Sequence, residues 1–238
     1  MPSGTLFIVA TPIGNLSDMT FRAIEILKSV DFVLCEDTRV TKKLLNHYNI
    51  ATQTMSYHQH STGQKVQEIV ELLEQGKNLA LVSDAGTPGI SDPGNLLIAE
   101  IYKREQLDIQ IIPIPGASAV ISALSVSGFS TDKFLFLGFP PHKKKRQKFF
   151  QSLAESMYTV AFYESNHRIA KALESMNSVL EPDREICVCR ELTKSFESIY
   201  RGNMSDILNQ KIPEKGEFVV VVQGKAKFHG GDESENEE

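Results

Sequence analysis

Short apolar segments of strand length alternate with helical patterns through the first half of this chain. Strands are expected at 5–10 (TLFIVA), 31–35 (DFVLC), 78–82 (NLALV) and 109–114, and helices at 17–30, 41–48, 66–73, 96–103 and 117–126. Ser17 is the expected N-cap of the first helix. Strands that alternate with helices indicate a parallel sheet covered by helices on both faces.

A second set of α/β elements follows a break at 128–141, which ends in Pro140-Pro141. Strands are expected at 134–139, 159–163, 185–189, 195–201 and 218–222, with a helix at 168–179. We therefore expect two α/β domains, 1–128 with a mostly parallel sheet and 129–224 with a mixed sheet, and a ligand cleft between them. Residues 225–238 form an acidic tail with little apolar content, and we expect this tail to be disordered.

Charge and hydropathy exclude several classes of protein. The net charge of the 238 residues is −5, and only −2 remains when the acidic tail is left out, so nucleic acid could bind only at a local basic patch. No apolar run approaches the roughly 20 residues of a membrane span. A signal peptide has a basic stretch before its apolar segment, and no such stretch precedes the first apolar run here. We expect a cytoplasmic protein without a membrane segment.

Three cysteines are too few for a disulfide framework in a chain of this size. Cys187 and Cys189 fall on one face of an expected strand, where they are interpreted as small buried residues. No second pair of ligands has the spacing of a metal site, and no metal is predicted.

The most informative loop is Ser83–Gly94 (SDAGTPGISDPG), which directly follows the strand at 78–82. Its twelve residues include three glycines, two prolines and two aspartates. Glycines let a ligand approach the backbone closely, and ordinary loops between a strand and a helix are only about two to six residues long. Ligands of open α/β sheets bind outside the carboxyl ends of the strands, so this loop indicates a binding site.

Two further loops follow strands in the same way: Thr11–Asn15 (TPIGN) and Pro115–Ala119 (PGASA). In a parallel sheet all three loops lie at one edge. Neither short loop matches the GxGxxG or Walker A pattern, which argues against hydride transfer to a dinucleotide and against P-loop phosphoryl transfer. A cofactor held mainly by backbone groups fits these loops better.

Together these motifs resemble the tetrapyrrole-methylase superfamily, and within it the branch that methylates small-subunit ribosomal RNA. The resemblance rests on TPIGNL, CEDTR (35–39), the loop 83–94, PGASA, FYES-x-HR (162–168), RELTK-x-x-E (190–197) and KGEFVVVV (215–222), and it spans about residues 5–223. It implies a two-domain enzyme, usually a homodimer, that uses S-adenosylmethionine to methylate the 2′-hydroxyl of a cytidine in the decoding region of 16S rRNA in the small subunit.

Carried over by position, the resemblance also implies a set of cofactor-binding residues. These are Thr11, Pro12, Ile13, Ala85, Gly86, Thr87, Ile90, Ser118, Ala119 and Tyr163, with Glu164 beside Tyr163. Tetrapyrrole-modifying relatives usually carry an acidic residue where Thr87 stands. Asp84 is the residue we expect to replace it.

A ribose hydroxyl is a weak nucleophile, so a positioned base is expected to help the reaction. The candidates for this role are Asp37, Glu164, Glu191 and Glu197, with Lys194 or Arg39 steadying developing charge, and the leading catalytic set is Asp37, Glu164 and Lys194. Two alternatives stay open from sequence: Asp37 caps the following helix, and Glu191 with Lys194 forms a surface ion pair.

RNA contacts are expected at a basic run and at one histidine. The run HKKKRQK (142–148) holds five basic residues in seven, and phosphate contacts from such side chains supply affinity and orientation. The same run is also typical of a solvated helix face. The predicted RNA-binding residues are Arg39, Lys43, His58, Lys143, Lys144, Lys145, Arg146 and Arg168, and His60 is a further candidate for stacking on a base.

Two other functions remain open at this point. One is a methyltransferase for a tetrapyrrole or another small molecule. The other is a non-catalytic module that binds the cofactor and docks on the ribosome.

Overall fold

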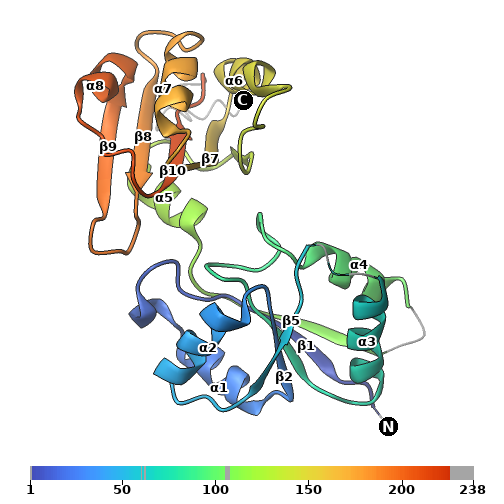
Figure 1. The fold of residues 1–238 in the computed structure, drawn as a ribbon. Helices are drawn as coiled ribbons and strands as arrows, with labels where there is room; N and C mark the ends of the chain where they lie inside the picture. The colour runs from blue at the N-terminus through green and yellow to red at the C-terminus, as the bar shows by residue number, and fades with distance from the viewer. Residues whose placement is uncertain (1, 60, 62, 105–107, 226–238) are drawn as a thin grey trace, which may run out of the picture. The chain divides into compact units, whose positions relative to one another are not determined.

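The computed structural model describes residues 2–59, 61, 63–104 and 108–225 (Figure 1). The chain divides into two compact units, Met1–Ala119 and Val120–Glu238. The boundary expected from sequence follows residue 128, whereas the second unit begins at Val120. Helix α5 (Ala119–Ser127) therefore falls almost wholly in the second unit. His60 and tail residues 226–238 lie outside the described residues.

Unit 1 is built on a parallel sheet of five strands in the order β3-β2-β4-β1-β5. The strands are β1 (Thr5–Val9), β2 (Phe32–Cys35), β3 (Gln53–Ser56), β4 (Leu79–Leu81) and β5 (Gln110–Ile114). The expected parallel sheet is confirmed. Strand β3 was not expected, because QTMS at the edge of the sheet is only partly buried and has no apolar run.

Helices cover both faces of this sheet, because alternate residues of each strand point to opposite sides. In β2, Val33 and Cys35 pack in one core with helices α1 (Phe21–Ser29) and α2 (Thr38–His47). Leu34 points the other way, into the core formed with α3 (Gly63–Glu74) and α4 (Asn95–Tyr102). Figure 1 shows the two helix pairs on opposite sides of the strands.

The starts of two helices differ from the sequence prediction. The N-cap of α1 is Thr20, whose side chain accepts a hydrogen bond from the N–H of Ala23, and Ser17 instead lies in the 3₁₀ turn η1 (Leu16–Asp18). Helix α2 starts three residues earlier than expected because Asp37 caps it, with the side chain accepting from the N–H of Arg39 at 2.8 Å.

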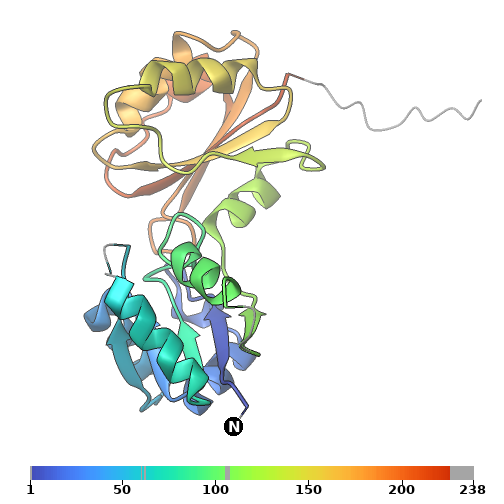
Figure 2. The ribbon, with the colours of Figure 1, turned by 90° about the vertical axis from the view of Figure 1, so that its right-hand side faces the viewer.

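Unit 2 is built on a mixed sheet in the order β6-β7-β10-β8-β9, in which only the β6–β7 pair is parallel. Its strands are β6 (Phe134–Phe136), β7 (Thr159–Ser165), β8 (Glu185–Arg190), β9 (Ser198–Asn203) and β10 (Glu217–Val222). Helices α6 (Arg146–Glu155), α7 (Ile169–Asn177) and α8 (Met204–Asn209) all pack in one core with β7, β8 and β10. Figure 2 shows α6 and α7 across one face of the sheet. The expected mixed sheet is confirmed, whereas α6 and α8 were not predicted as helices.

Cys187 and Cys189 lie on the opposite face of β8 from this core, with their sulfur atoms 3.8 Å apart. Both side chains are fully buried, as expected for small residues in a sheet. None of the helices in the described part of the chain is both long and apolar enough to span a bilayer.

We predict that Phe162→Ala destabilises unit 2 by about 3–5 kcal/mol, because the ring is fully buried and its removal leaves a cavity. The Phe162 ring packs edge-on against Phe149 and Phe150, with centroid distances of 5.6 and 6.2 Å. The measurement is hydrogen exchange of peptides from β7, β8 and β10. The control is Phe134→Ala in edge strand β6, where the side chain is 38% exposed and the same truncation is expected to change exchange little. Equal effects of the two changes would contradict this description of the core.

Candidate functional site

The carboxyl ends of the five parallel strands of unit 1 lie at one edge of its sheet. The loops that leave β1, β4 and β5 at this edge are those that the sequence singles out: 11–15, 83–94 and 115–119. In open α/β folds this edge is where ligands bind. The site is therefore built from loops held in place by the strands behind them.

Two reciprocal backbone hydrogen bonds join the first loop to the long one. The N–H of Thr11 donates to the carbonyl of Gly86 at 2.9 Å, and the N–H of Gly86 donates to the carbonyl of Thr11 at 3.0 Å. Side-chain hydroxyls strengthen the junction: Thr11 Oγ1 donates to the carbonyl of Ser83 at 3.0 Å, and Ser83 Oγ donates to the carbonyl of Gly86 at 2.9 Å. The two loops therefore form one rigid element.

The third loop joins the same element. Thr87 Oγ1 donates to the carbonyl of Ala117 at 3.1 Å. Gly86 has a φ of +88°, and a Cβ there would lie 3.3 Å from Cγ2 of Ile13, so a larger residue would be both strained and crowded. Gly116 passes closely over the residue that precedes the first loop, since a Cβ at Gly116 would lie 2.9 Å from the Cβ of Ala10.

The residues predicted to bind the cofactor fall into two groups by location. All except Tyr163 belong to these three loops or to the start of α5; Tyr163 lies on β7 in unit 2. Thr11, Pro12, Ile13 and Gly86 are buried, Thr87, Ser118 and Ala119 are half-buried, and Asp84, Ala85 and Ile90 are exposed. The buried members shape the loops, and the exposed members can touch a ligand.

A pocket of about 540 Å³ lies beside these loops, where β2, β3 and β4 end. Its lining residues are Glu36, Asp37, Thr38, Arg39, Ser56, His58, Gln59 and Asp84. It therefore brings together Asp37, Arg39 and His58, predicted for catalysis or RNA contact, with Asp84, predicted for the cofactor. Glu36, Thr38, Ser56 and Gln59 were missed by the sequence analysis, although Glu36 directly follows β2 just as Asp84 closely follows β4.

Asp37 is the carboxylate of this pocket with the most hydrogen-bond donors around it. The guanidinium of Arg39 binds both of its oxygens, at 3.1 and 2.6 Å, and lowers the pKa of Asp37 to about 2. The backbone N–H of Asp37 donates to Asp84 at 3.2 Å, which ties β2 to the long loop. Such an acidic carboxyl is a weak proton acceptor at neutral pH. The helix cap considered from sequence is confirmed, and a catalytic role for Asp37 stays a prediction.

Asp92, near the end of the long loop, has the opposite electrostatic environment. Burial raises the pKa of Asp92 to about 6, a hydrogen bond with Ser83 offsets part of this rise, and the charges of Glu36 and Asp84 add to it. The edge of the sheet thus carries several carboxylates close enough to influence one another. Clustered negative charge of this kind attracts a cation.

Glu164, on β7 in unit 2, is held between two arginines. Its side chain is 0% exposed, Oε2 lies 3.1 Å from Arg146 and Oε1 lies 2.9 Å from Arg168. The backbone N–H of Ser165 donates to Oε1 at 2.9 Å as well. The structure therefore brings together Glu164, predicted for catalysis, and two arginines predicted for RNA binding.

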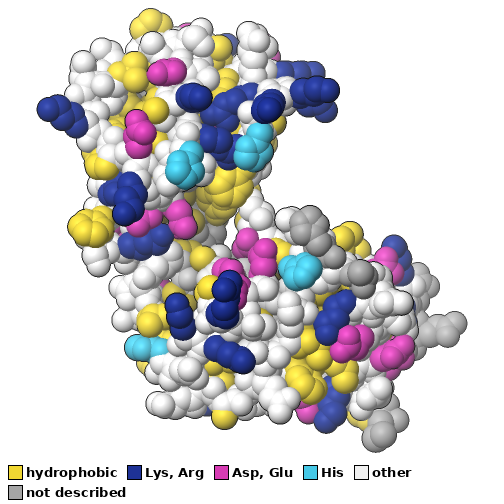
Figure 3. Space-filling model, in the orientation of Figure 1, with side chains coloured by type: hydrophobic (Ala, Val, Ile, Leu, Met, Phe, Trp, Pro, Cys, Tyr) yellow, Lys and Arg dark blue, Asp and Glu magenta, His cyan; other side chains and the backbone are white. Residues whose placement is uncertain are grey.

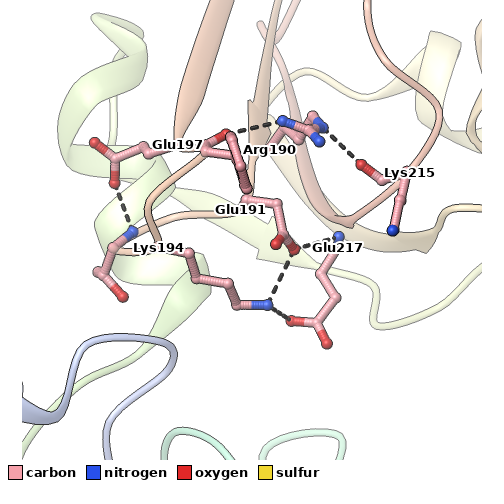
Figure 4. A network of polar contacts seen from close by, with 8 residues as sticks. Arg190, Glu191, Lys194, Glu197, Lys215 and Glu217 are labelled. Carbon is pink, nitrogen blue, oxygen red and sulfur yellow. Dashed lines mark hydrogen bonds and ion pairs between the residues drawn. The ribbon is translucent and has the colours of Figure 1, made fainter.

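Lys194 belongs to a different network of unit 2, at the turn between β8 and β9 (Figure 4). Its ammonium group lies 3.0 Å from Glu191 and 2.7 Å from Glu217. Burial alone would lower the pKa of Lys194, but hydrogen bonds and charge from both carboxylates outweigh burial and raise the pKa. The ion pair of Glu191 and Lys194 that the sequence left open is confirmed, and catalysis by Lys194 stays a prediction.

The basic run of unit 2 lies at the start of α6. His142, Lys143, Lys144, Lys145 and Lys148 are exposed, and Figure 3 shows Lys and Arg side chains gathered on this part of the unit. Lys43 is exposed on α2 of unit 1. No group of three or more His, Cys, Asp or Glu side chains within the described ranges is placed to hold a metal ion.

Relatives with curated names resemble the chain over most of its length. A protein of Halalkalibacterium halodurans named Ribosomal RNA small subunit methyltransferase I is 46% identical over 229 residues, which is 94% of this chain and 77% of that protein. Proteins with the same name from Synechocystis and Bacillus subtilis are each 47% identical, over 93% of this chain and 79% and 75% of their own lengths.

Solved structures share the fold at low sequence identity. The methyltransferase CobJ matches with a TM-score of 0.68 and 20% identity, covering 96% of this chain and 98% of its own. The cobalt precorrin-4 methyltransferase CbiF matches with a TM-score of 0.65 and 18% identity, covering 92% of this chain and 94% of its own. These similarities confirm the α/β fold predicted from sequence.

The family model for tetrapyrrole (corrin/porphyrin) methylases matches residues 5–208, which is most of the chain. The resemblance noted from the motifs is thereby confirmed, together with the methyltransferase class and the use of S-adenosylmethionine that it implies. The chain belongs to the tetrapyrrole methylase family, and within it to the group of the small-subunit ribosomal RNA methyltransferases just described.

Proposed function

We propose that this protein transfers a methyl group from S-adenosylmethionine to the 2′-hydroxyl of a cytidine in the 16S rRNA of the small ribosomal subunit. The observation that carries the rRNA substrate is identity of 46–47% to named small-subunit rRNA methyltransferases over more than nine-tenths of the chain. The cytidine and its 2′-hydroxyl rest on the motif resemblance. A homodimer and a cytoplasmic location stay predictions.

The three joined loops of unit 1 suit S-adenosylmethionine. Gly86 and the small residues around it let a ligand approach the loop backbone closely, and exposed Asp84 offers a carboxylate to a hydroxyl or an ammonium group. The neighbouring carboxylates favour a ligand with positive charge. When bound, S-adenosylmethionine supplies an activated methyl group on a sulfonium.

We assign the adjoining pocket to the acceptor nucleoside. Its volume of about 540 Å³ lies within the usual range of small-ligand sites. Carboxylates accept hydrogen bonds from the exocyclic amine of cytosine, and Glu36 and Asp84 supply such acceptors. Because Asp84 also belongs to the cofactor loops, the acceptor would lie next to the donor, and holding the two in contact distance supplies most of the catalysis in a direct methyl transfer.

The first prediction is methyl transfer itself. Small subunits from cells that lack the activity, incubated with the protein and labelled S-adenosylmethionine, are expected to gain ribose-bound label at one cytidine. Label on a base instead of the ribose, or cofactor binding without any transfer, would each contradict the proposal.

In the same assay Gly86→Val is expected to abolish both cofactor binding and transfer, because a side chain at φ +88° is strained and would press on Ile13. The matched control is Gly63→Val at the start of α3, where a Cβ would have no neighbour within 4 Å. Calorimetry measures the cofactor affinity and circular dichroism the fold. If a folded Gly86→Val variant still bound the cofactor, the long loop could not be part of the cofactor site as proposed.

A further prediction concerns the pH dependence of cofactor binding. The pKa of Asp92 is raised to about 6, so the carboxyl loses its proton and becomes negative as the pH rises through 6. We expect affinity for the cationic cofactor to rise about 3- to 10-fold between pH 5 and 7, and we expect Asp92→Asn to flatten this rise. The cofactor affinity of the wild type and of Asp92→Asn is measured by calorimetry at several pH values.

The control for this pH experiment is His58→Gln, which replaces a side chain that lines the adjoining pocket. We expect this variant to keep the pH dependence of cofactor binding. Loss of the dependence in His58→Gln and not in Asp92→Asn would contradict the role assigned to Asp92.

Another prediction concerns the basic run. Replacing Lys143, Lys144 and Lys145 by alanine is expected to weaken RNA binding and to lower the slope of log affinity against log salt by about 2, since each contact with single-stranded phosphate contributes about 0.7. The control replaces three lysines of unit 1, Lys28, Lys65 and Lys103, and so removes the same charge. An equal salt dependence of RNA binding in both triple variants would indicate that the basic run is only a solvated surface and does not contact RNA.

A further inference from the structure

Glu164 is a buried charge that the proposed reaction leaves without an assigned task. Its carboxylate is completely shielded from solvent, and an ion in that position is stable only when its partners satisfy it. Arg146 binds its Oε2, and Arg168 and the N–H of Ser165 both bind its Oε1. Both of its oxygens are therefore occupied by donors, which leaves neither of them ready to accept a proton from a substrate.

The two arginines are fixed differently around this carboxylate. Arg168 also donates from Nε to Ser165 Oγ at 3.2 Å and from NH1 to the carbonyl of Pro140 at 3.2 Å. The guanidinium of Arg146 lies 5.0 Å from the ring centroid of Phe150, and its NH1 is buried without a hydrogen-bond partner among the described residues. Their side chains are 18% and 16% exposed, so each still presents an edge to solvent.

The charges of this cluster do not balance. Two guanidinium groups face one carboxylate, and the adjoining residues 142–148 add only cationic and neutral side chains. An anion at the exposed edge of the two guanidinium groups would balance this excess positive charge. The planar fork of arginine matches the oxygens of a phosphate, and a fork already held in position loses little freedom when it binds.

We propose that Arg146 and Arg168 form a preorganised clamp for a backbone phosphate of the RNA substrate, and that Glu164 is the positioning residue that holds the clamp. This inference rests on the proposed function, and it gives Glu164 a task other than the proton transfer expected from sequence. The ligand is a phosphodiester of RNA rather than a free phosphate, because the exposed lysines 143–145 extend the cationic surface beyond the reach of a single anion.

The decisive test uses the sign of a charge change. Glu164→Gln removes one negative charge beside the two arginines. If Glu164 acted only through its charge, RNA would bind more tightly to this variant. If Glu164 holds the arginines in position, RNA would bind more weakly. We expect the affinity for a fluorescein-labelled single-stranded RNA of twelve nucleotides, measured by anisotropy, to fall at least about 5-fold. Glu181→Gln, which removes a carboxylate paired with Arg184 elsewhere in unit 2, is the matched control and is not expected to weaken binding.

A second pair of variants decides the matter if Glu164→Gln does not fold. Arg146→Lys and Arg168→Lys keep the charge but lose the planar fork, and each is expected to weaken RNA binding about 5- to 10-fold. Arg201→Lys, at an exposed arginine paired with Glu185, is the control and is expected to bind as the wild type does. Wild-type affinity in both clamp variants would overturn the proposal.

Two further measurements separate this inference from its alternatives. Cofactor affinity by calorimetry is expected to be unchanged in Glu164→Gln, and its selective loss would assign Glu164 to the cofactor site and overturn the clamp. Pyrophosphate alone, measured by calorimetry, is expected to bind at least about 10-fold more weakly than the twelve-nucleotide RNA, and equal or tighter binding would indicate a site for a free anion and would also overturn the proposal. Because RNA binding is measured without turnover, absent methyl transfer by the wild type would count against the proposed function alone.

Discussion

Two backbone hydrogen bonds between Thr11 and Gly86 join the loop after β1 to the loop after β4, and the candidate site depends on this junction. The strands behind the loops are neighbours in the sheet, so their carboxyl ends already lie side by side. The reciprocal bonds then fix how the loops continue beyond the strands. A glycine is required at the junction because the backbone there has a φ of +88° and Ile13 lies close by. The protein's own backbone thus fixes how these two loops are arranged.

Local sequence patterns predicted the elements that carry strong signals. The apolar strands β1, β2, β4 and β5 and the long loop 83–94 were expected close to their observed places. Strand β3 and helices α6 and α8 were missed for a common reason: their burial comes from packing against distant parts of the chain. Helix α6, for instance, begins inside the basic run, where charge hides the helical pattern of Phe150 and Leu153.

The pocket could not be read from sequence for a related reason. Its residues come from the ends of three strands, at Glu36, Ser56 and Asp84, which are widely separated in the chain. They meet only because the sheet has the order β3-β2-β4, and periodicity gives the type of an element but not its neighbours. The long loop was predicted as a ligand site because its composition is unusual, whereas Ser56 and Gln59 occur in sequence that looks ordinary.

Three carboxylates that look alike in sequence differ in what their surroundings allow. Asp37 has a pKa of about 2 because Arg39 binds it, and Asp92 has a pKa of about 6 because it is buried among other acids. Glu164 is shielded from solvent and forms ion pairs with two arginines. An ion pair in the interior is a poor source of stability, since well-packed apolar side chains of similar volume often serve as well. Two cations around one buried anion are harder still to explain by stability, because much of the excess positive charge is removed from water without a second anion to offset it. The same arrangement is favourable when a second anion completes it from outside, and the phosphate backbone of the proposed RNA substrate is such an anion.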